Sequence, residues 1–170
     1  MMASIPSHDL WDNPLGTDGF EFIEYTSPNA TELAELFERL GFTAIARHRS
    51  KNVTLYRQGD INFILNAEPN SQAEHFSGIH GPSANAIAFR VKDSAKALNA
   101  LVAGGAKPVE SGAGPMELRI PAIEGIGGSL IYLVDRYGNQ THLRRRFSTD
   151  SRGGITAAWR WPHLCGSLDS

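Results

Sequence analysis

Residues 20–40, FEFIEYTSPNATELAELFERL, decide the fold of the first part of this chain. Residues 20–25 alternate between apolar and acidic side chains, which is the period of a half-buried strand. A Ser-Pro pair then breaks the strand. Residues 31–40 place three leucines and one phenylalanine at helical spacing. The stretch therefore predicts a strand followed by an amphipathic helix.

The residues on either side of the predicted helix fix its two ends. Asn29 or Thr31 is the expected N-cap, and Gly41 stands where a helix C-terminus favours glycine. Three short strands are predicted next, with a Gly-Asp turn signal before the last of them. These strands cover residues 42–48, 53–58 and 61–66.

The same order of elements returns in the second half of the chain. Residues 84–91 predict a strand, and Asp93 or Ser94 caps a helix that runs to about residue 103. Three more strands are expected at residues 107–111, 116–121 and 129–134. A repeated unit of this kind predicts an α+β fold of two tandem βαβββ modules.

The modules span about residues 20–67 and 84–138, joined by a segment with a short helix. Together they form one predicted domain, residues 20–141. Residues 1–19 are polar and turn-rich and form an N-terminal arm. Residues 142–170 have no strand or helix period and form an irregular tail.

Composition excludes several classes of protein. The net charge of −2 argues against a nucleic-acid partner. No apolar run approaches the roughly 20 residues of a membrane span, so no membrane partner is expected. Cys165 is the only cysteine, and the N-terminus lacks a signal-peptide pattern, so the cytoplasm is the expected location. The glycine-rich segments 112–114 and 125–128 connect strands and do not open a helix, which disfavours a phosphate site.

Four long motifs carry a family resemblance. They are NPLGTDGFEFIEYTSP, RHRSKNVTLYRQGDINFILNAEPNS, HGPSANAIAFRVKDS and GPMELRIPAIEGIGGSLIYLVDRYG. In this order they strongly resemble the N-terminal domain of bacterial 4-hydroxyphenylpyruvate dioxygenase, a member of the vicinal oxygen chelate superfamily. The resemblance covers about residues 13–141.

The resemblance implies a reaction and a cofactor. The family converts 4-hydroxyphenylpyruvate and O2 to homogentisate and CO2 in tyrosine catabolism, using Fe(II) held by two His and one carboxylate. In the family these ligands lie in the C-terminal catalytic domain. By the same resemblance, the positions that carry a His and the Glu there fall near Ala86 and Tyr132 of this chain, and neither is a plausible iron ligand.

The resemblance therefore predicts no catalytic, cofactor-binding or metal-binding residue in this chain. Its expected partners are the missing catalytic domain and further copies of itself in a homo-oligomer. Whether the chain alone is an enzyme stays open. The alternative is a standalone small-molecule-binding protein of the same superfamily, with its ligand between the modules.

Other candidate residues favour structural roles. The six histidines show no converging set; they are His8, His48, His75, His80, His142 and His163. Glu21 and Glu24 lie three apart on a strand, so they face opposite sides and are expected to be solvated or edge charges.

A basic cluster and one thiol complete the candidates. The cluster comprises Arg47, Arg49, Lys51 and Arg57. Its members could bind a carboxylate substrate, but pairing with Glu at a domain or subunit contact is favoured. Cys165 lies in the patternless tail, which cannot hold catalytic geometry.

The tail itself suggests a shifted reading frame. After Thr141 the family continues with a run resembling Ile-Tyr-Asp-Val-Asp-Phe, whereas residues 142–147 here read HLRRRF. One coding of the family run is ATC TAC GAC GTC GAT TTT. An extra C in front gives CAT CTA CGA CGT CGA TTT, which encodes His-Leu-Arg-Arg-Arg-Phe. We therefore expect a one-base insertion near codon 141; a genuine lineage-specific tail is the alternative.

Overall fold

The computed structural model describes residues 12–48, 51–110 and 120–135 of the chain. Its first module contains β1 (Thr17–Thr26), α1 (Ala30–Arg39), β2 (Thr43–Arg47), β3 (Val53–Gln58) and β4 (Ile61–Asn66). The helix α2 (Gln72–His80) comes next. The second module contains β5 (Ser83–Val91), α3 (Ser94–Ala103), β6 (Pro108–Val109), β7 (Ala122–Glu124), the 3₁₀ turn η1 (Ile126–Gly128) and β8 (Leu130–Val134).

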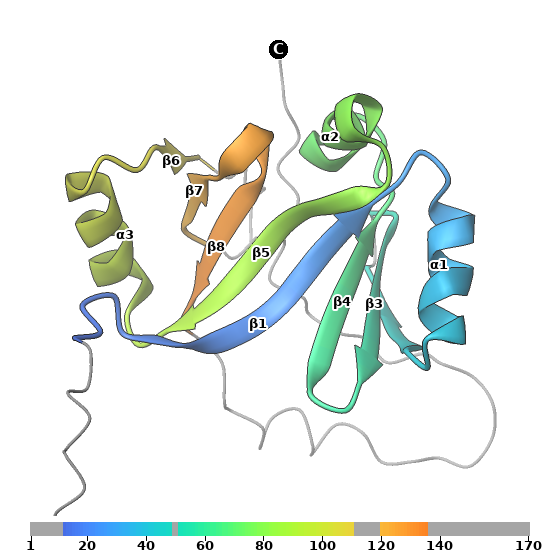
Figure 1. Cartoon of the computed structure of the whole chain (residues 1–170), viewed down its shortest axis with the longest axis horizontal. Helices are drawn as coiled ribbons and strands as arrows, with labels where there is room; N and C mark the ends of the chain where they lie inside the picture. Colours follow the sequence, from blue (N-terminus) through green and yellow to red (C-terminus); the bar gives the residue numbers. More distant parts are fainter. Residues whose placement is uncertain (1–11, 49–50, 111–119, 136–170) are drawn as a thin grey trace, which may run out of the picture.

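All eight strands of the described residues form one sheet in the order β2-β3-β4-β1-β5-β8-β7-β6. The first strand of each module pairs in parallel with the last strand of the same module, β1 with β4 and β5 with β8. The two first strands pair antiparallel at the centre of the sheet. Figure 1 shows β1 and β5 side by side across the middle of the molecule, with α1 near one end and α3 near the other. The predicted fold of two tandem βαβββ modules is confirmed.

Capping residues recognised in the sequence form the N-terminal caps of α1 and α3. The side chain of Asn29 accepts a hydrogen bond from the backbone N–H of Glu32, and Asp93 accepts one from Lys96 at 2.8 Å. Each cap satisfies an N–H that has no partner within its helix. Of the paired alternatives, Asn29 and Asp93 are therefore the caps.

One predicted strand differs from the structure at the residues that are described. Of the predicted strand 116–121, only Ile120 and Pro121 fall within the described residues, and neither is in a strand. The strand β7 begins one residue later, at Ala122. Proline has no N–H to donate to a sheet, although the Pro121 carbonyl accepts a hydrogen bond from the N–H of Leu133 at 2.9 Å.

Three apolar clusters fill the fold. The shared core takes residues from both modules: Phe22, Val53, Leu55, Ile64, Ala86, Ala88, Ile120, Ala122 and Tyr132. The α1 core, within the first module, contains Phe37, Phe42, Tyr56 and Leu65. The α3 core contains Val91, Ala97 and Leu133. The shared core ties the two modules into one packed unit.

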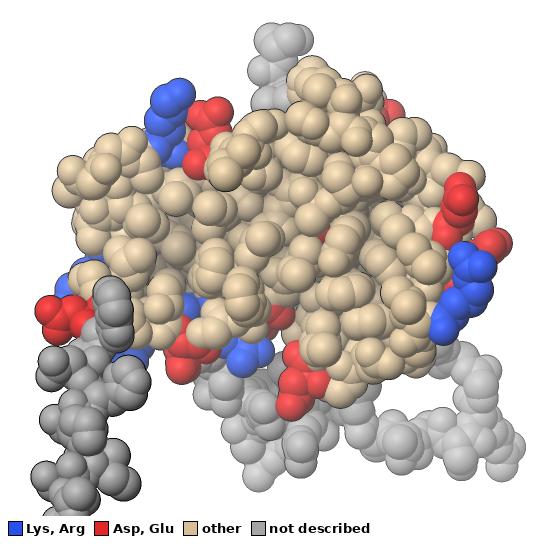
Figure 2. Space-filling view, viewed as in Figure 1, with Lys and Arg blue, Asp and Glu red and all other residues tan. Residues whose placement is uncertain are grey.

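Charged side chains lie mainly at the margins of the face seen in Figure 2, and its centre consists almost entirely of residues other than Lys, Arg, Asp and Glu. Phe20 is one exposed apolar residue of the central strands, and its ring centroid lies 4.8 Å from that of Phe89. Across the described ranges, we find no helix long and apolar enough to cross a bilayer.

Candidate functional site

The two positions that the family resemblance compares with iron ligands lie inside the shared core. Ala86 is on β5 and Tyr132 is on the adjacent parallel strand β8, where it pairs with Ala88. Both side chains are buried. Their surroundings are the apolar side chains of the shared core. Neither residue type at this place supplies the imidazole or carboxylate that Fe(II) requires.

The rest of the described chain does not supply an iron triad either. Within residues 12–48, 51–110 and 120–135, no group of three or more His, Cys, Asp or Glu side chains is placed to hold a metal ion. The residues described therefore do not fit Fe(II), and we assign no step of metal chemistry to them.

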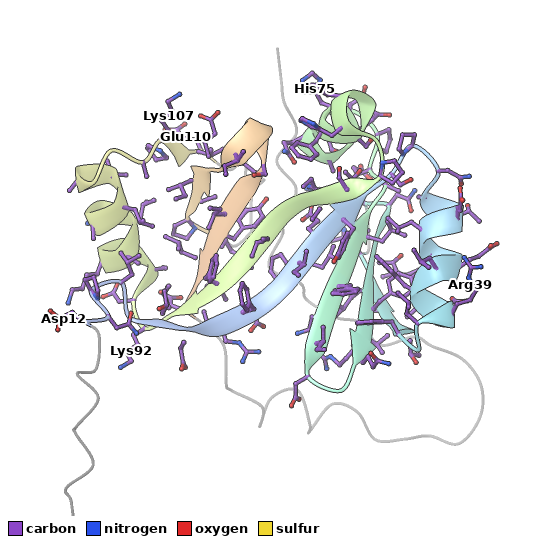
Figure 3. All side chains as sticks on the ribbon, viewed as in Figure 1. Asp12, Arg39, His75, Lys92, Lys107 and Glu110 are labelled. Atoms are coloured by element: carbon purple, nitrogen blue, oxygen red, sulfur yellow. The ribbon has the colours of Figure 1, made fainter. Side chains whose placement is uncertain are left out.

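The described histidines have separate environments. Nδ1 of His48 accepts a hydrogen bond from the N–H of Lys51 at 3.0 Å. His80 lies at the end of α2, with Nε2 3.1 Å from the Gly127 carbonyl oxygen and its ring 4.3 Å from Phe76. His75 projects outward from α2 (Figure 3). His8, His142 and His163 lie outside the described residues, as does Cys165.

A polar cluster that the sequence did not predict lies beside the shared core. Its centre is Glu24 on β1, which is only 2% exposed. Oε1 of Glu24 accepts hydrogen bonds from Nδ2 of Asn66 at 2.9 Å and from Nδ2 of Asn85 at 2.7 Å. Nδ2 of Asn85 also lies 3.2 Å from Oε1 of Gln72. We call these four residues the Glu24 cluster.

Elements from both modules and the joint bring the Glu24 cluster together. Glu24 pairs with Ala86 and the next residue, Tyr25, pairs with Ala84, so Asn85 is an extra residue on β5. Such a β-bulge re-aims a side chain, and here it accompanies the contact of Asn85 with Glu24. Gln72 comes from α2, and its Nε2 donates to the Gly128 carbonyl at 2.9 Å. The cluster thus links the two modules through α2.

Burial dominates the electrostatics of the Glu24 cluster. Desolvation raises the pKa of Glu24 above its ordinary value, and the hydrogen bonds from Asn85 and Asn66 oppose this only in part. Oε2 of Glu24 and Oδ1 of Asn85 are buried acceptors with no hydrogen-bond partner. The cluster contains one acid and three amides, so it lacks a nucleophile with an adjacent base.

The expectation that Glu24 is a solvated or edge charge is wrong. The strand period contained the signal, because Glu24 is in phase with the buried residues Phe22 and Thr26. Glu21 has a different environment: its Oε2 lies 2.5 Å from Nε of Arg90, and its side chain is 27% exposed. The two glutamates therefore form no paired-carboxylate site.

The hairpin geometry divides the predicted basic cluster. Arg47 pairs with Thr54, whereas Arg57 pairs with Thr43 near the other end of the β2–β3 hairpin. Nε of Arg57 donates to Oδ1 of Asn62 at 2.7 Å. Arg49 lies outside the described residues. An antiparallel pair separates residues near its turn from those near its open end, so Arg47 and Arg57 do not act as one site.

Comparisons with known proteins agree with the fold. The chain is 56% identical over 135 residues to 4-hydroxyphenylpyruvate dioxygenase of Pseudomonas sp. (strain P.J. 874), a match covering 79% of this chain and 38% of that protein. It is 58% identical over 132 residues to hemolysin VllY of Vibrio vulnificus (strain CMCP6), covering 76% of this chain and 37% of the relative. The chain thus spans well under half the length of these relatives.

A solved structure and a protein family match the same region. The structure is a xylose isomerase-like TIM barrel/4-hydroxyphenylpyruvate dioxygenase fusion protein, with 41% identity and a TM-score of 0.65. The match covers 79% of this chain and 22% of that one. Residues 11–148 match the family described as hydroxyphenylpyruvate dioxygenase, HPPD, N-terminal. With its paired modules and this match over most of its length, the chain belongs to the N-terminal domain family of hydroxyphenylpyruvate dioxygenase.

Proposed function

We propose that this chain is the non-iron-binding N-terminal domain of a 4-hydroxyphenylpyruvate dioxygenase, truncated by a frameshift and inactive alone. Joined to its C-terminal domain, it takes part in converting 4-hydroxyphenylpyruvate and O2 to homogentisate and CO2 in tyrosine catabolism. The observation that carries the proposal is the burial of Ala86 and Tyr132 in an apolar core. Fe(II) then belongs to the other domain.

The domain's role in the full enzyme is to pack against the iron domain and to help form subunit contacts in the cytoplasm. Exposed apolar side chains on α2 and η1 support this role, since such surface is suited to contacts with protein. Ile79 on α2 and Ile126 in η1 are both exposed. One relative is named a hemolysin, but the proposal follows the family description and the dioxygenase relatives.

The purified chain is expected to produce no homogentisate from 4-hydroxyphenylpyruvate, because its described residues offer no iron triad. The assay supplies Fe(II), ascorbate and O2, and chromatography measures homogentisate against a metal-free blank. Turnover above that blank contradicts the proposal.

A chimera provides the positive control for this assay. Residues 13–141 replace the matching part of the Pseudomonas sp. relative, whose own C-terminal region is kept. At 56% identity the domain contacts are expected to be largely retained, and the chimera should form homogentisate. A folded but inactive chimera would argue against an equivalent role for this domain.

Resequencing the gene around codon 141 tests the frameshift. We expect another frame downstream to resume with a His-bearing strand and to end with a Glu-bearing strand, as the family resemblance implies. A sound frame with no second half downstream would instead favour the standalone small-molecule-binding protein. Residues 142–170 lie outside the described structure, so the test relies on the nucleotide sequence.

A further inference from the structure

The Glu24 cluster presents an imbalance of donors and acceptors. As a carboxylate, Glu24 has one oxygen that accepts two hydrogen bonds and a second, Oε2, that accepts none. Oδ1 of Asn85 is also buried without a partner. A buried acceptor that lacks a donor costs about 1–3 kcal/mol, more if it is charged. Two such atoms in side chains that are hydrogen-bonded to each other indicate that this pair lacks a donor.

Protonation of Glu24 supplies that donor, and no additional molecule has to fit into the buried cluster. Asn85 already donates from Nδ2 to Oε1 of Glu24 at 2.7 Å. A carboxylic acid offers an O–H beside its carbonyl oxygen, and an amide offers a carbonyl oxygen beside its N–H. The acid and the amide can therefore bond to each other twice, once in each direction.

We propose that Glu24 is a neutral carboxylic acid whose Oε2–H donates to Oδ1 of Asn85, and that this proton is a pH-sensitive lock between the two modules. Glu24 belongs to the first module and Asn85 to the second. Gln72, from α2, extends the network to the Gly128 carbonyl. Loss of the proton would leave a buried carboxylate in contact with a buried carbonyl oxygen, which weakens the junction.

The ionisable groups on the surrounding elements have other partners or face solvent. On the central strands, Glu21 and Arg90 bind each other. On α2, Glu74, His75 and His80 are exposed, and after β4, Oε2 of Glu68 accepts from the Asn52 N–H. Two tyrosines also lie on the surrounding strands, Tyr25 on β1 and Tyr132 on β8. Burial raises the pKa of the Tyr25 phenol above its ordinary value of 10.0. The causes of the Glu24 pKa shift are accordingly burial and its two amide donors.

The sign of the pH dependence is set by this raised pKa. An acid with a higher pKa in the folded state binds more protons when folded, so its stabilising effect is complete below the ordinary pKa of 4.5. It declines as pH rises from there to the folded pKa. In that window Glu24 is expected to raise the unfolding equilibrium constant about tenfold per pH unit.

Glu24→Gln in the full chain tests the lock, because glutamine is uncharged, has the shape of the neutral acid and can donate an N–H where the acid donates its O–H. Urea unfolding at pH 5 should give similar stability for both proteins. At higher pH the variant should be more stable, and its advantage in the equilibrium constant should grow by about tenfold per pH unit until the folded pKa of Glu24 is reached. Glu35→Gln, on the exposed face of α1, is the matched control and should keep the pH slope of the parent.

Carbon-13 NMR of the parent chain gives a readout that does not depend on the variant's folding. At pH 6, which is above the ordinary pKa of a glutamate, the Cδ signal of Glu24 should remain at the shift of a protonated acid. An ionised Glu24 at pH 6 overturns the proposal. So does a Glu24→Gln variant that is less stable at every pH, since a carboxylate held by a trapped water or cation would behave that way.

Discussion

Phe37→Ala is expected to destabilise the chain by about 3–5 kcal/mol, the usual cost of removing a buried phenylalanine ring. Phe37 is 3% exposed at the centre of the α1 core. Its ring packs edge-on against Tyr25 and Tyr56, with centroids 5.3 and 5.4 Å away, and also meets Phe63 at 5.2 Å. Alanine would leave a cavity among several aromatic rings, which cannot all move inward to fill it.

Urea denaturation followed by circular dichroism measures this loss. Leu36→Ala is the matched control, because Leu36 is the preceding residue of α1 and is 40% exposed. It should cost far less, since little apolar surface is returned to water. Equal losses for the two variants would show that α1 does not pack on the sheet as described.

Ile64→Ala is expected to cost about 2–5 kcal/mol and to weaken both modules at once. Ile64 is fully buried on β4, and it belongs to the shared core together with Ala86 and Tyr132 of the second module. A cavity at this point removes contacts on either side of the module boundary. The global free energy of unfolding should therefore fall, and strands of both modules should lose protection.

Hydrogen exchange distinguishes a shared effect from a local one. In Ile64→Ala, amides of β8 should exchange faster together with those of β4, because both depend on the same unfolding reaction. Ile61→Ala, at the start of the same strand and 55% exposed, is the control and should leave exchange in β8 nearly unchanged. Faster exchange confined to β1–β4 would contradict a core common to both modules.

The sequence predicted best where the decisive interactions are local. The strands β3 and β4 have the predicted bounds, and α1 and α3 lie within one residue of theirs, because side-chain period, caps and turns act over a few residues. Of the strand predicted at 116–121, the described residues Ile120 and Pro121 lie outside β7, and Pro121 has no N–H to donate to a sheet. There the alternation of side chains gave no hint of where sheet pairing begins.

By itself, then, the sequence determined the order of elements, the repeat of the βαβββ unit and, through its long motifs, the family. Only the tertiary structure decided which polar residues form a buried hydrogen-bonded cluster. The amides of Gln72, Asn66 and Asn85 look like ordinary surface groups in the chain, and the strand period indicates the burial of Glu24 but not its partners. A bulge on β5, parallel pairing of β1 with β4 and the position of α2 bring them together. These contacts join residues up to 61 positions apart, and a local pattern has no access to pairings over that range.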